Sequence, residues 1–398
     1  MQRYKLKATK KYEQKFLNGY PLIAKESLEN INTLKDEGAI IDIIDNKNHF
    51  IARAYYGRQN KGYGWVLTQN KKEQIDLNFF KQKIKSAIDY RANFYKSKDT
   101  NAFRVFNGEG DGVGGLSIDY FNGYYLITWY SIGIYKFKDT ILNALKSLVE
   151  FKGIYQKKRF DSKGQYLEES SDFLLGQEAP EPLIVKENGV NFAIYLDDGA
   201  MVGVFLDQKD VRKKIRDKYA KGKDILNTFS YTGAFSVYAA LGGAKSTTSV
   251  DLAKRSLAKT KEQFEINNLS LKSNKIVVED VFDYFKYAFK KGLKFDMVIA
   301  DPPSFARSKK RTFSAKKDYK SLLKDIIKIT NKSGVIVAST NAANFNMKTF
   351  KSFVEKAFKA ESRKYKILES YSLPKDFRVS KNFLEGNYLK VLFIKIID

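Results

Sequence analysis

The sequence contains no cysteine among its 398 residues. This absence excludes disulfides, zinc sites built on thiolates and every mechanism that uses a cysteine nucleophile. Histidine occurs once, as His49, in a turn-like segment between two expected strands. A single histidine argues against a histidine-based catalytic triad and against a metal cluster. We therefore expect no metal site.

Long apolar runs are also missing. No run approaches the roughly 18 residues of a membrane-spanning helix, and the N-terminal Met-Gln-Arg-Tyr-Lys-Leu-Lys lacks a signal-type apolar region. We therefore expect a cytoplasmic protein. Hydrophobic residues make up 43% of the chain, enough to build cores, and its length suits two or three domains.

Positive charge is in large excess: 71 Lys and Arg against 45 Asp and Glu give 71 − 45 = +26. The excess is spread along the chain instead of forming a tail. It favours a polyanionic partner such as nucleic acid. The alternative is a lysine-rich proteome, in which such an excess is ordinary.

The first two regions predict small domains. In residues 1–72, strand-like runs at 39–44 and 49–56 flank a turn, which indicates a β-rich domain. Its basic residues Arg53 and Arg58 are candidates for RNA contact, or they belong to a barrel surface and core. Residues 73–185 predict an α/β domain with a hairpin around Asn122-Gly123 and a linker at 161–182.

From residue 186 onward the pattern changes. Runs at 190–196 and 201–206 predict a hairpin across Asp198-Gly199. Strand-like and helix-like segments then alternate to the end of the chain, which is typical of a doubly wound parallel sheet. The expected strands lie at 225–226, 246–250, 275–278, 295–300, 334–340, 365–371 and 388–397. The predicted class is α/β.

The segment from Asp224 to Phe235 predicts a strand, a tight turn and a helix, the opening unit of a nucleotide-binding domain. Gly233 stands where a ligand would lie close to the backbone. The other glycines of the dinucleotide motif and the P-loop lysine are missing. The ligand expected is therefore an adenosine without phosphates, S-adenosylmethionine (SAM); the alternative is an ordinary βα turn.

Three carboxylates, Asp251, Asp280 and Asp301, follow successive strands, at the edge where such sheets bind ligands. Asp251 stands 251 − 233 = 18 residues after the glycine, the place of an acid that binds ribose hydroxyls. Asp301-Pro302-Pro303 predicts a rigid bend with free carbonyl groups. Phe305 is a candidate to stack on a flipped base, or else a core residue of a stiffened loop.

Asn227–Phe235 together with Asp301–Phe305 resembles the SAM-dependent methyltransferases of large-subunit ribosomal RNA, the RlmI/RlmK-like group. The segment from Phe205 to Arg212 resembles their Phe-Leu-Asp-Gln-Arg-x-x-Arg segment. The resemblance covers the whole chain. It implies a PUA-like RNA-binding domain at 1–72, a linking α/β domain at 73–185 and a Rossmann-like methyltransferase domain at 186–398, and it allows a homodimer. The implied SAM site comprises Phe205, Asp207, Gln208, Asn227, Phe229, Ser230, Tyr231, Thr232, Gly233, Asp251, Leu252, Asp280, Val281 and Asp301.

One departure bears on the chemistry. RlmI-like members that form 5-methylcytosine carry a fifth-strand cysteine, where this chain has Ala338-Ser-Thr-Asn341. Cytosine C5 is a poor nucleophile until a thiolate adds to C6, so that route is closed. Guanine N7 has an in-plane lone pair and needs only positioning and stabilisation of the cationic base. The segment from Ser339 to Phe345 also resembles the RlmK-type guanine-N7 enzymes.

The sequence therefore predicts SAM-dependent methylation of 23S ribosomal RNA at guanine N7. The predicted catalytic residues are Asp301, Pro302, Pro303, Phe305 and Asn341, and the basic residues Lys309, Lys310 and Arg311 are expected to contact phosphates. Two alternatives stay open. One is methylation of guanine N2 or another exocyclic amine, although Ser304 interrupts the usual adjacent aromatic. The other is a non-catalytic, RNA-binding ribosome-assembly factor.

Overall fold

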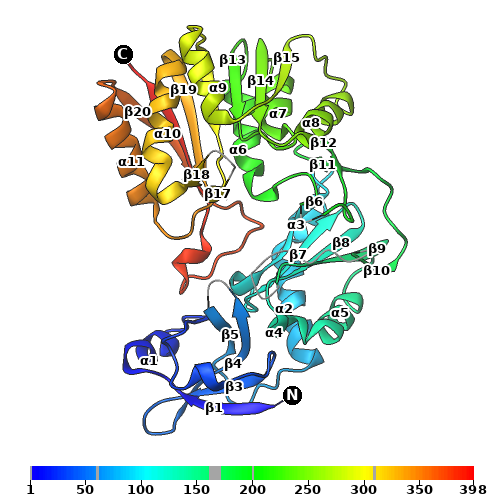
Figure 1. The fold of residues 1–398 in the computed structure, drawn as a ribbon. Helices are drawn as coiled ribbons and strands as arrows, with labels where there is room; N and C mark the ends of the chain where they lie inside the picture. Colours follow the sequence, from blue (N-terminus) through cyan, green and yellow to red (C-terminus); the bar gives the residue numbers. More distant parts are fainter. Residues whose placement is uncertain (1, 60–61, 161–171, 200, 308–310) are drawn as a thin grey trace. The chain divides into compact units, whose positions relative to one another are not determined.

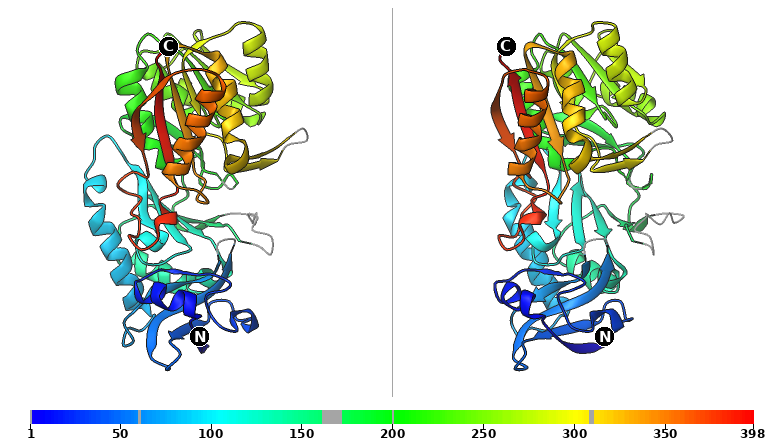
Figure 2. Two further views of the ribbon diagram at one scale, coloured as in Figure 1. Left: turned by 90° about the vertical axis from the view of Figure 1, so that its left-hand side faces the viewer. Right: turned by 60° about the vertical axis from the view of Figure 1, so that its left-hand side comes forward.

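The computed structural model describes residues 2–59, 62–160, 172–199, 201–307 and 311–398 (Figures 1 and 2). The chain divides into two compact units. The first contains Met1–Lys186, Ile194–Val202 and Lys375–Gly386, and the second contains Glu187–Ala193, Gly203–Pro374 and Asn387–Asp398. The first unit holds two separate five-stranded sheets, and the predicted domain boundaries at residues 72 and 185 stay predictions.

The elements of the first sheet and its helices are β1 (Arg3–Lys7), α1 (Lys10–Leu17), β2 (Leu22–Ile23), η1 (Ile31–Thr33), β3 (Ile40–Ile44), β4 (Phe50–Gln59) and β5 (Gly62–Thr68). The strand order is β1-β3-β4-β5-β2. Side chains of β3 and β4 pack with Phe16 of α1 in one buried cluster. The strands expected at 39–44 and 49–56 are confirmed as an antiparallel pair. Their β-branched and aromatic residues suit a sheet that is buried on both faces here, since Ile41 and Ile40 belong to different cores.

The second sheet has the order β10-β9-β8-β7-β6. Its region comprises α2 (Leu77–Tyr90), α3 (Ala92–Tyr95), β6 (Ala102–Asn107), η2 (Gly108–Gly110), β7 (Leu116–Phe121), β8 (Tyr124–Trp129), α4 (Ile132–Tyr135), α5 (Lys138–Lys146), β9 (Gly153–Lys158) and β10 (Phe173–Gly176). The hairpin expected at Asn122-Gly123 is confirmed, with φ values of 48° and 99° at these residues. The predicted linker at 161–182 includes β10, so that part of the prediction is wrong; residues 161–171 lie outside the described residues.

The predicted hairpin across Asp198-Gly199 is also wrong. The pair that forms is β11 (Leu183–Glu187) with β12 (Val190–Ile194), and no strand occurs among the described residues from 201 to 206. The turn between these strands is Asn188-Gly189, with φ values of 49° and 80°. An Asn-Gly turn accepts positive φ at both central residues and matches the twist of the strands, which suits the hairpin that forms here.

The second unit is organised around a seven-stranded sheet of order β15-β14-β13-β16-β19-β21-β20. Strands β13 to β16 and β19 run parallel, and β21 runs antiparallel to both of its neighbours. The expected strands are all present. The elements are η3 (Leu206–Gln208), α6 (Lys209–Lys214), η4 (Ile215–Tyr219), β13 (Asp224–Thr228), α7 (Ala234–Leu241), β14 (Ser246–Asp251), α8 (Arg255–Glu265), β15 (Asn274–Val278), α9 (Val281–Lys290), β16 (Phe295–Ala300), β17 (Phe305–Arg307), β18 (Thr312–Ser314), α10 (Ala315–Ile329), β19 (Thr330–Thr340), α11 (Met347–Ala360), β20 (Tyr365–Tyr371), η5 (Leu384–Gly386, in the first unit) and β21 (Lys390–Ile396).

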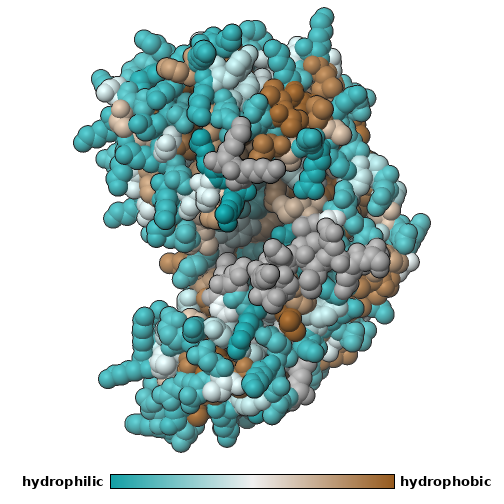
Figure 3. Space-filling model, in the orientation of Figure 1, coloured by the Kyte–Doolittle hydropathy of each residue, from teal (hydrophilic) through white to brown (hydrophobic). Residues whose placement is uncertain are grey.

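The face of the protein drawn in Figure 3 is mostly hydrophilic, as expected for a chain with 71 Lys and Arg. Within the ranges that the structure describes, no helix has both the length and the apolar character to cross a bilayer.

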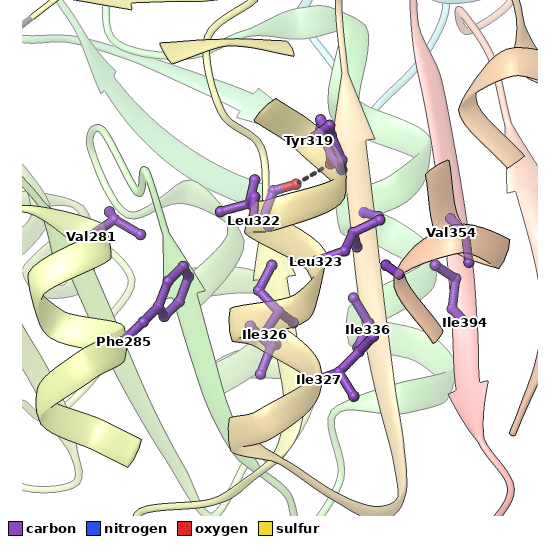
Figure 4. Close-up of a cluster of buried hydrophobic side chains, with 14 of the residues drawn as sticks. Val281, Phe285, Tyr319, Leu322, Leu323, Ile326, Ile327, Ile336, Val354 and Ile394 are labelled. Atoms are coloured by element: carbon purple, nitrogen blue, oxygen red, sulfur yellow. Dashed lines mark hydrogen bonds between the residues drawn. The ribbon is translucent and has the colours of Figure 1, made fainter. Parts of the chain in front are cut away.

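A large buried core lies beside α10 on one face of this sheet. Apolar residues of α10 recur every three or four positions and so form one stripe along the helix. Figure 4 shows Leu322 and Ile326 on the side of α9, and Leu323 and Ile327 on the side of β19. All four are at most 1% exposed. This packing fixes β16 and β19, and with them the residues that follow at their carboxyl ends.

Candidate active site

The loop between β13 and α7 holds three residues with left-handed backbone: Phe229 (φ 55°), Tyr231 (φ 53°) and Gly233 (φ 77°). For a residue other than glycine this conformation costs on the order of 1–3 kcal/mol. The loop is held by Asp251, whose Oδ2 accepts the main-chain N–H of Tyr231 at 2.8 Å, and by the Thr232 hydroxyl, which donates to the Gly203 carbonyl at 2.7 Å. Strain that is fixed by specific contacts is typical of a ligand-binding loop.

Gly233 is required for a reason that the sequence did not reveal. A Cβ at this position would lie 2.4 Å from the Cγ2 atom of Thr260 on α8. The glycine therefore provides the positive φ and permits the close approach of α8 to the start of α7. The close approach of a ligand, expected from the sequence, stays a prediction.

Asp251 and Asp280 follow β14 and β15 at the same edge of the sheet, as predicted. The second oxygen of Asp251, Oδ1, accepts the Ala253 N–H at 2.9 Å. Asp280 is the N-cap of α9 and accepts the N–H groups of Phe282 and Asp283 at 3.0 and 3.2 Å. Both carboxylates thus shape their loops by capping backbone donors, in addition to any contact with a ligand.

Asp301 belongs to a polar cluster at the centre of this edge. The amide of Gln208 donates to Asp301 Oδ2 at 3.1 Å and to the Ser339 hydroxyl at 2.7 Å. Burial of the carboxyl group raises the pKa of Asp301 to about 6, against an opposing effect of the Ser339 hydroxyl, and the neighbouring Asp207 raises it further. Asp207 in turn accepts a hydrogen bond from Tyr388 at 3.0 Å. The structure therefore brings together two acids predicted for this site, Asp207 and Asp301.

The segment from Phe205 to Gln208 is anchored by a buried ion pair. Arg212 donates to both oxygens of Glu187 at 2.8 Å and to the carbonyl of Phe205 at 2.7 Å. The Phe205 ring lies 5.4 Å from the ring of Tyr231, so this segment meets the strained loop. Glu187 stands 25 residues before Arg212, outside any local motif, and was not predicted.

Ser339, Tyr319 and Tyr388 were also not predicted. Each acts through a single hydroxyl that is far away in sequence from its partner, which leaves no local pattern to recognise. Only Ser339 falls in a segment that the sequence had singled out.

Two residues of the predicted SAM site have side chains that are enclosed by protein. The Asn227 side chain is 1% exposed and donates to the Ser236 hydroxyl at 3.0 Å. Val281 is 4% exposed and packs in the core with Phe285, as Figure 4 shows. The contacts of these two residues with SAM stay predictions. Leu252, by contrast, is 54% exposed at the carboxyl end of β14.

The segment after β16 presents an exposed aromatic ring. Pro302 is buried and Pro303 exposed, and Phe305 on β17 is 63% exposed, so it is not a core residue. Asn341 is exposed directly after β19. The guanidinium of Arg311 lies 4.2 Å from the centre of the Phe282 ring; Lys309 and Lys310 lie outside the described residues.

In the first unit, Arg53 and Arg58 have different environments. Arg53 is 2% exposed, pairs with Asp42 at 2.8 Å and donates to the carbonyls of Lys71 and Glu73. The RNA contact predicted for Arg53 is therefore wrong, because its donors are buried and used. Arg58 is exposed, and its guanidinium lies 5.5 Å from the ring of Tyr63.

Comparison with known proteins identifies the family. Residues 104–380 match the family described as S-adenosylmethionine-dependent methyltransferase, and residues 6–69 match a PUA-like domain. The chain is 57% identical to YwbD of Bacillus subtilis (strain 168), provisionally assigned as a ribosomal RNA large subunit methyltransferase, over 97% of this chain and 98% of the relative. It is 30% identical to ribosomal RNA large subunit methyltransferase I of Aeromonas salmonicida (strain A449), over 96% and 97%. The chain belongs to the SAM-dependent ribosomal RNA large subunit methyltransferases.

The fold of this methyltransferase is also that of a solved relative. The crystal structure of SMU.776, provisionally assigned as a methyltransferase and complexed with SAH (S-adenosylhomocysteine), has a TM-score of 0.91 and 40% identity over 99% of this chain and 100% of that chain. The predicted PUA-like domain, Rossmann-like methyltransferase fold and SAM cofactor are thereby confirmed.

The polar groups at the carboxyl edge fit this cofactor. Two buried side-chain atoms there, Ser230 Oγ and Gln208 Oε1, have no hydrogen-bond partner within the described residues. Buried polar atoms are normally paired, so a ligand with hydroxyl and amino groups would supply the missing partners. SAM carries both kinds of group.

Proposed function

We propose that this methyltransferase modifies guanine N7 of 23S ribosomal RNA. The observation that carries the proposal is the complete absence of cysteine from a chain of this family. Similarity to methyltransferase I of Aeromonas salmonicida favours cytosine C5, the target of the RlmI-like members with a fifth-strand cysteine. That reaction needs a thiolate to activate the ring, and this chain has none.

Ser339 does not replace the missing thiolate. It stands in the same fifth-strand segment, yet its side chain is fully buried, and its hydroxyl accepts a hydrogen bond from Gln208 at 2.7 Å. A nucleophile must reach C6 of the base, which a fully buried side chain does not, and a serine hydroxyl is a much weaker nucleophile than a thiolate at neutral pH even beside a carboxylate such as Asp301. Direct attack by a nitrogen lone pair avoids both requirements.

In the proposed reaction, the N7 lone pair of guanine attacks the electrophilic methyl group that SAM supplies when bound, with cleavage of the sulfur–methyl bond and S-adenosylhomocysteine as the leaving group. No proton leaves the base, which becomes cationic. The Asp301 carboxylate and the carbonyl groups of the Asp301-Pro302-Pro303 bend stabilise this charge. Phe305 stacks on the target base and Asn341 orients its edge. These side chains need only position and stabilise.

We assign the SAM contacts to the same edge. The Ser230 hydroxyl and Asp251 bind the ribose hydroxyls, and Leu252 and Asp280 meet the adenine. Gln208 and Asp207 contact the amino-acid end, while Phe205 covers the site. Support comes from the unpartnered Ser230 Oγ and Gln208 Oε1 atoms and from the exposure of Leu252 and Phe205, 54% and 41%.

The RNA is proposed to contact the exposed cations on both units. Arg58 belongs to the PUA-like domain, and Arg311 follows the segment that carries Phe305. Such contacts make binding strongly dependent on salt concentration. A homodimer is also part of the proposal, drawn from the family resemblance, and light scattering of the purified chain tests it.

Methylation of an exocyclic amine is the second candidate. It is favoured by one observation: burial raises the pKa of Asp301 to about 6. A carboxylate with this pKa is better suited to accept the proton that an amine must lose. The guanine N7 reaction needs no such acceptor.

Nucleoside mass spectrometry separates the candidates. Unmodified 23S RNA and precursor particles are incubated with the enzyme and methyl-labelled SAM, then digested to nucleosides. Label in 7-methylguanosine supports the proposal. Label in N2-methylguanosine would support the amine reaction, and label in 5-methylcytidine would overturn the argument from the missing cysteine.

A further inference from the structure

Lys390 is a buried lysine at the catalytic edge of the sheet that the proposed reaction does not use. It is the first residue of β21 and pairs in register with Thr340, the last residue of β19. The residue is only 4% exposed. Among the described residues, no carboxylate forms an ion pair with it; its ammonium donates to two main-chain carbonyls and lies 5.5 Å from the centre of the Phe345 ring.

Such a lysine does not serve stability. A buried charge without an acidic partner is costly, and burial lowers the pKa of Lys390 to about 8. An apolar residue would suit this strand better, since its neighbours Val391 and Leu392 are fully buried. Residues whose type is unfavourable in their local structure, such as a lysine in a buried strand, are concentrated at functional sites.

The two carbonyls belong to segments that flank the site. The ammonium donates to the carbonyl of Ala342 at 3.0 Å and to that of Tyr388 at 2.6 Å. Tyr388 is itself fixed, because its hydroxyl donates to Asp207 at 3.0 Å. The ammonium therefore joins the loop after β19 to an anchored segment before β21.

This contact is made next to Asn341. Its neighbours Thr340 and Ala342 are at most 4% exposed, and the Ala342 N–H donates to the Thr340 hydroxyl at 3.2 Å. With the carbonyl of Ala342 held by Lys390, the turn is fixed on both sides. Asn341 is the exposed residue between them, and its amide makes no side-chain hydrogen bond within the described residues.

We propose that Lys390 is a positioning residue for methyl transfer: by holding the Ala342 carbonyl against the Tyr388 segment, it fixes the loop that presents Asn341 to the target base. This inference rests on the proposed function, which gives Asn341 its role. Lys390 touches neither substrate nor cofactor and acts through the loop.

The test is a double-mutant cycle on the full chain. K390M keeps the length of the side chain and removes all three donors, and N341A removes the amide. Turnover is measured as label transferred from SAM to unmodified 23S RNA, whichever nucleoside receives it. We expect K390M to lower kcat at least tenfold, with KM for SAM and RNA within threefold. Its melting temperature shows that the variant folds, since the lost carbonyl hydrogen bonds and the removed buried charge act on stability in opposite directions.

In an N341A background, the same K390M change is expected to lower kcat less than threefold, because its effect passes through Asn341. Additive losses or an unchanged kcat in K390M would overturn the inference. K390R keeps donors at this position and is expected to recover part of the activity. If K390M does not fold, K390R replaces it in the double-mutant cycle with N341A. K395M is the matched control, since Lys395 lies on the same strand opposite Val335, at the other end of the pairing; we expect wild-type kcat.

A failure of the proposed function and a failure of the inference on Lys390 give different results. If the wild-type product is a nucleoside other than 7-methylguanosine, the proposed target is wrong, while the K390M effect on label transfer still tests Lys390. If the product is 7-methylguanosine and K390M turns over normally, only the inference on Lys390 fails.

Discussion

The Tyr319 hydroxyl donates to the main-chain oxygen of Ser339 at 2.6 Å. Tyr319 lies on α10 and is fully buried, so one hydroxyl ties the helix to the end of β19. The next residue but one is Asn341, and the Ser339 side chain belongs to the Asp301 cluster. The large core beside α10 is thus coupled directly to the carboxyl edge of the sheet, where the proposed active site lies.

Replacing this tyrosine tests the coupling. We expect Tyr319→Phe to lower the free energy of unfolding by about 1–3 kcal/mol, because the buried Ser339 carbonyl loses its donor. We also expect a lower kcat with little change in SAH affinity, measured by denaturation and by label transfer. Tyr287→Phe is the control, since Tyr287 is 52% exposed; equal effects of the two changes would contradict the coupling.

The raised pKa of Asp301 predicts a pH dependence of turnover. The proposed reaction uses the charged carboxylate, so kcat should fall as pH drops through about 6, approaching a tenfold loss for each pH unit. Asp301→Asn should bind SAH nearly normally, lose most turnover and lack this pH dependence. A pH profile with an unshifted midpoint near 4 would contradict the assignment.

The same shift has a consequence for stability, with the sign set by linkage. The folded protein binds a proton at Asp301 below pH about 6, whereas an unfolded carboxyl does so only near pH 4. Stability therefore decreases as pH rises through this window. The free energy of unfolding of Asp301→Asn should exceed the wild-type value by more at pH 7.5 than at pH 4.

The fold was largely predictable from the sequence. Each strand of the second unit has its own apolar run, and turns such as Asn122-Gly123 have a recognisable sequence. The hairpin across Asp198-Gly199 failed on a local choice of turn, whereas the errors on side chains came from contacts made at a distance. Arg53 looks like a surface cation in sequence, and only the folded chain reveals its partner Asp42. Val281 follows a strand in the expected place, yet its side chain turns into the core. Lys390 gave no signal at all, because its role depends on pairing with β19.

The ion pair between Arg212 and Glu187 should be the main contact that stabilises the segment from Phe205 to Gln208. Arg212→Met leaves a fully buried carboxylate without its partner, which typically costs about 3–5 kcal/mol. Adding Glu187→Gln should recover part of the loss, as measured by urea denaturation. Lys213→Met removes an exposed ion pair with Asp217 and should cost less than about 1 kcal/mol. If Arg212→Met also costs less than about 1 kcal/mol of unfolding free energy, the ion pair is not desolvated and the prediction is wrong.

Phe305 provides the most direct test of base stacking. Its side chain is 63% exposed, so Phe305→Ala should leave stability and SAH affinity nearly unchanged. If the ring stacks on the target base, its removal should lower kcat/KM for RNA by about 10- to 100-fold, the equivalent of about 1–3 kcal/mol per stacked base. Phe289→Ala is the matched control, because Phe289 is 60% exposed on α9. If both changes have a similarly small effect on kcat/KM for RNA, Phe305 is an ordinary exposed ring. The target base would then have to be held by Asn341 and the bend at Asp301 alone.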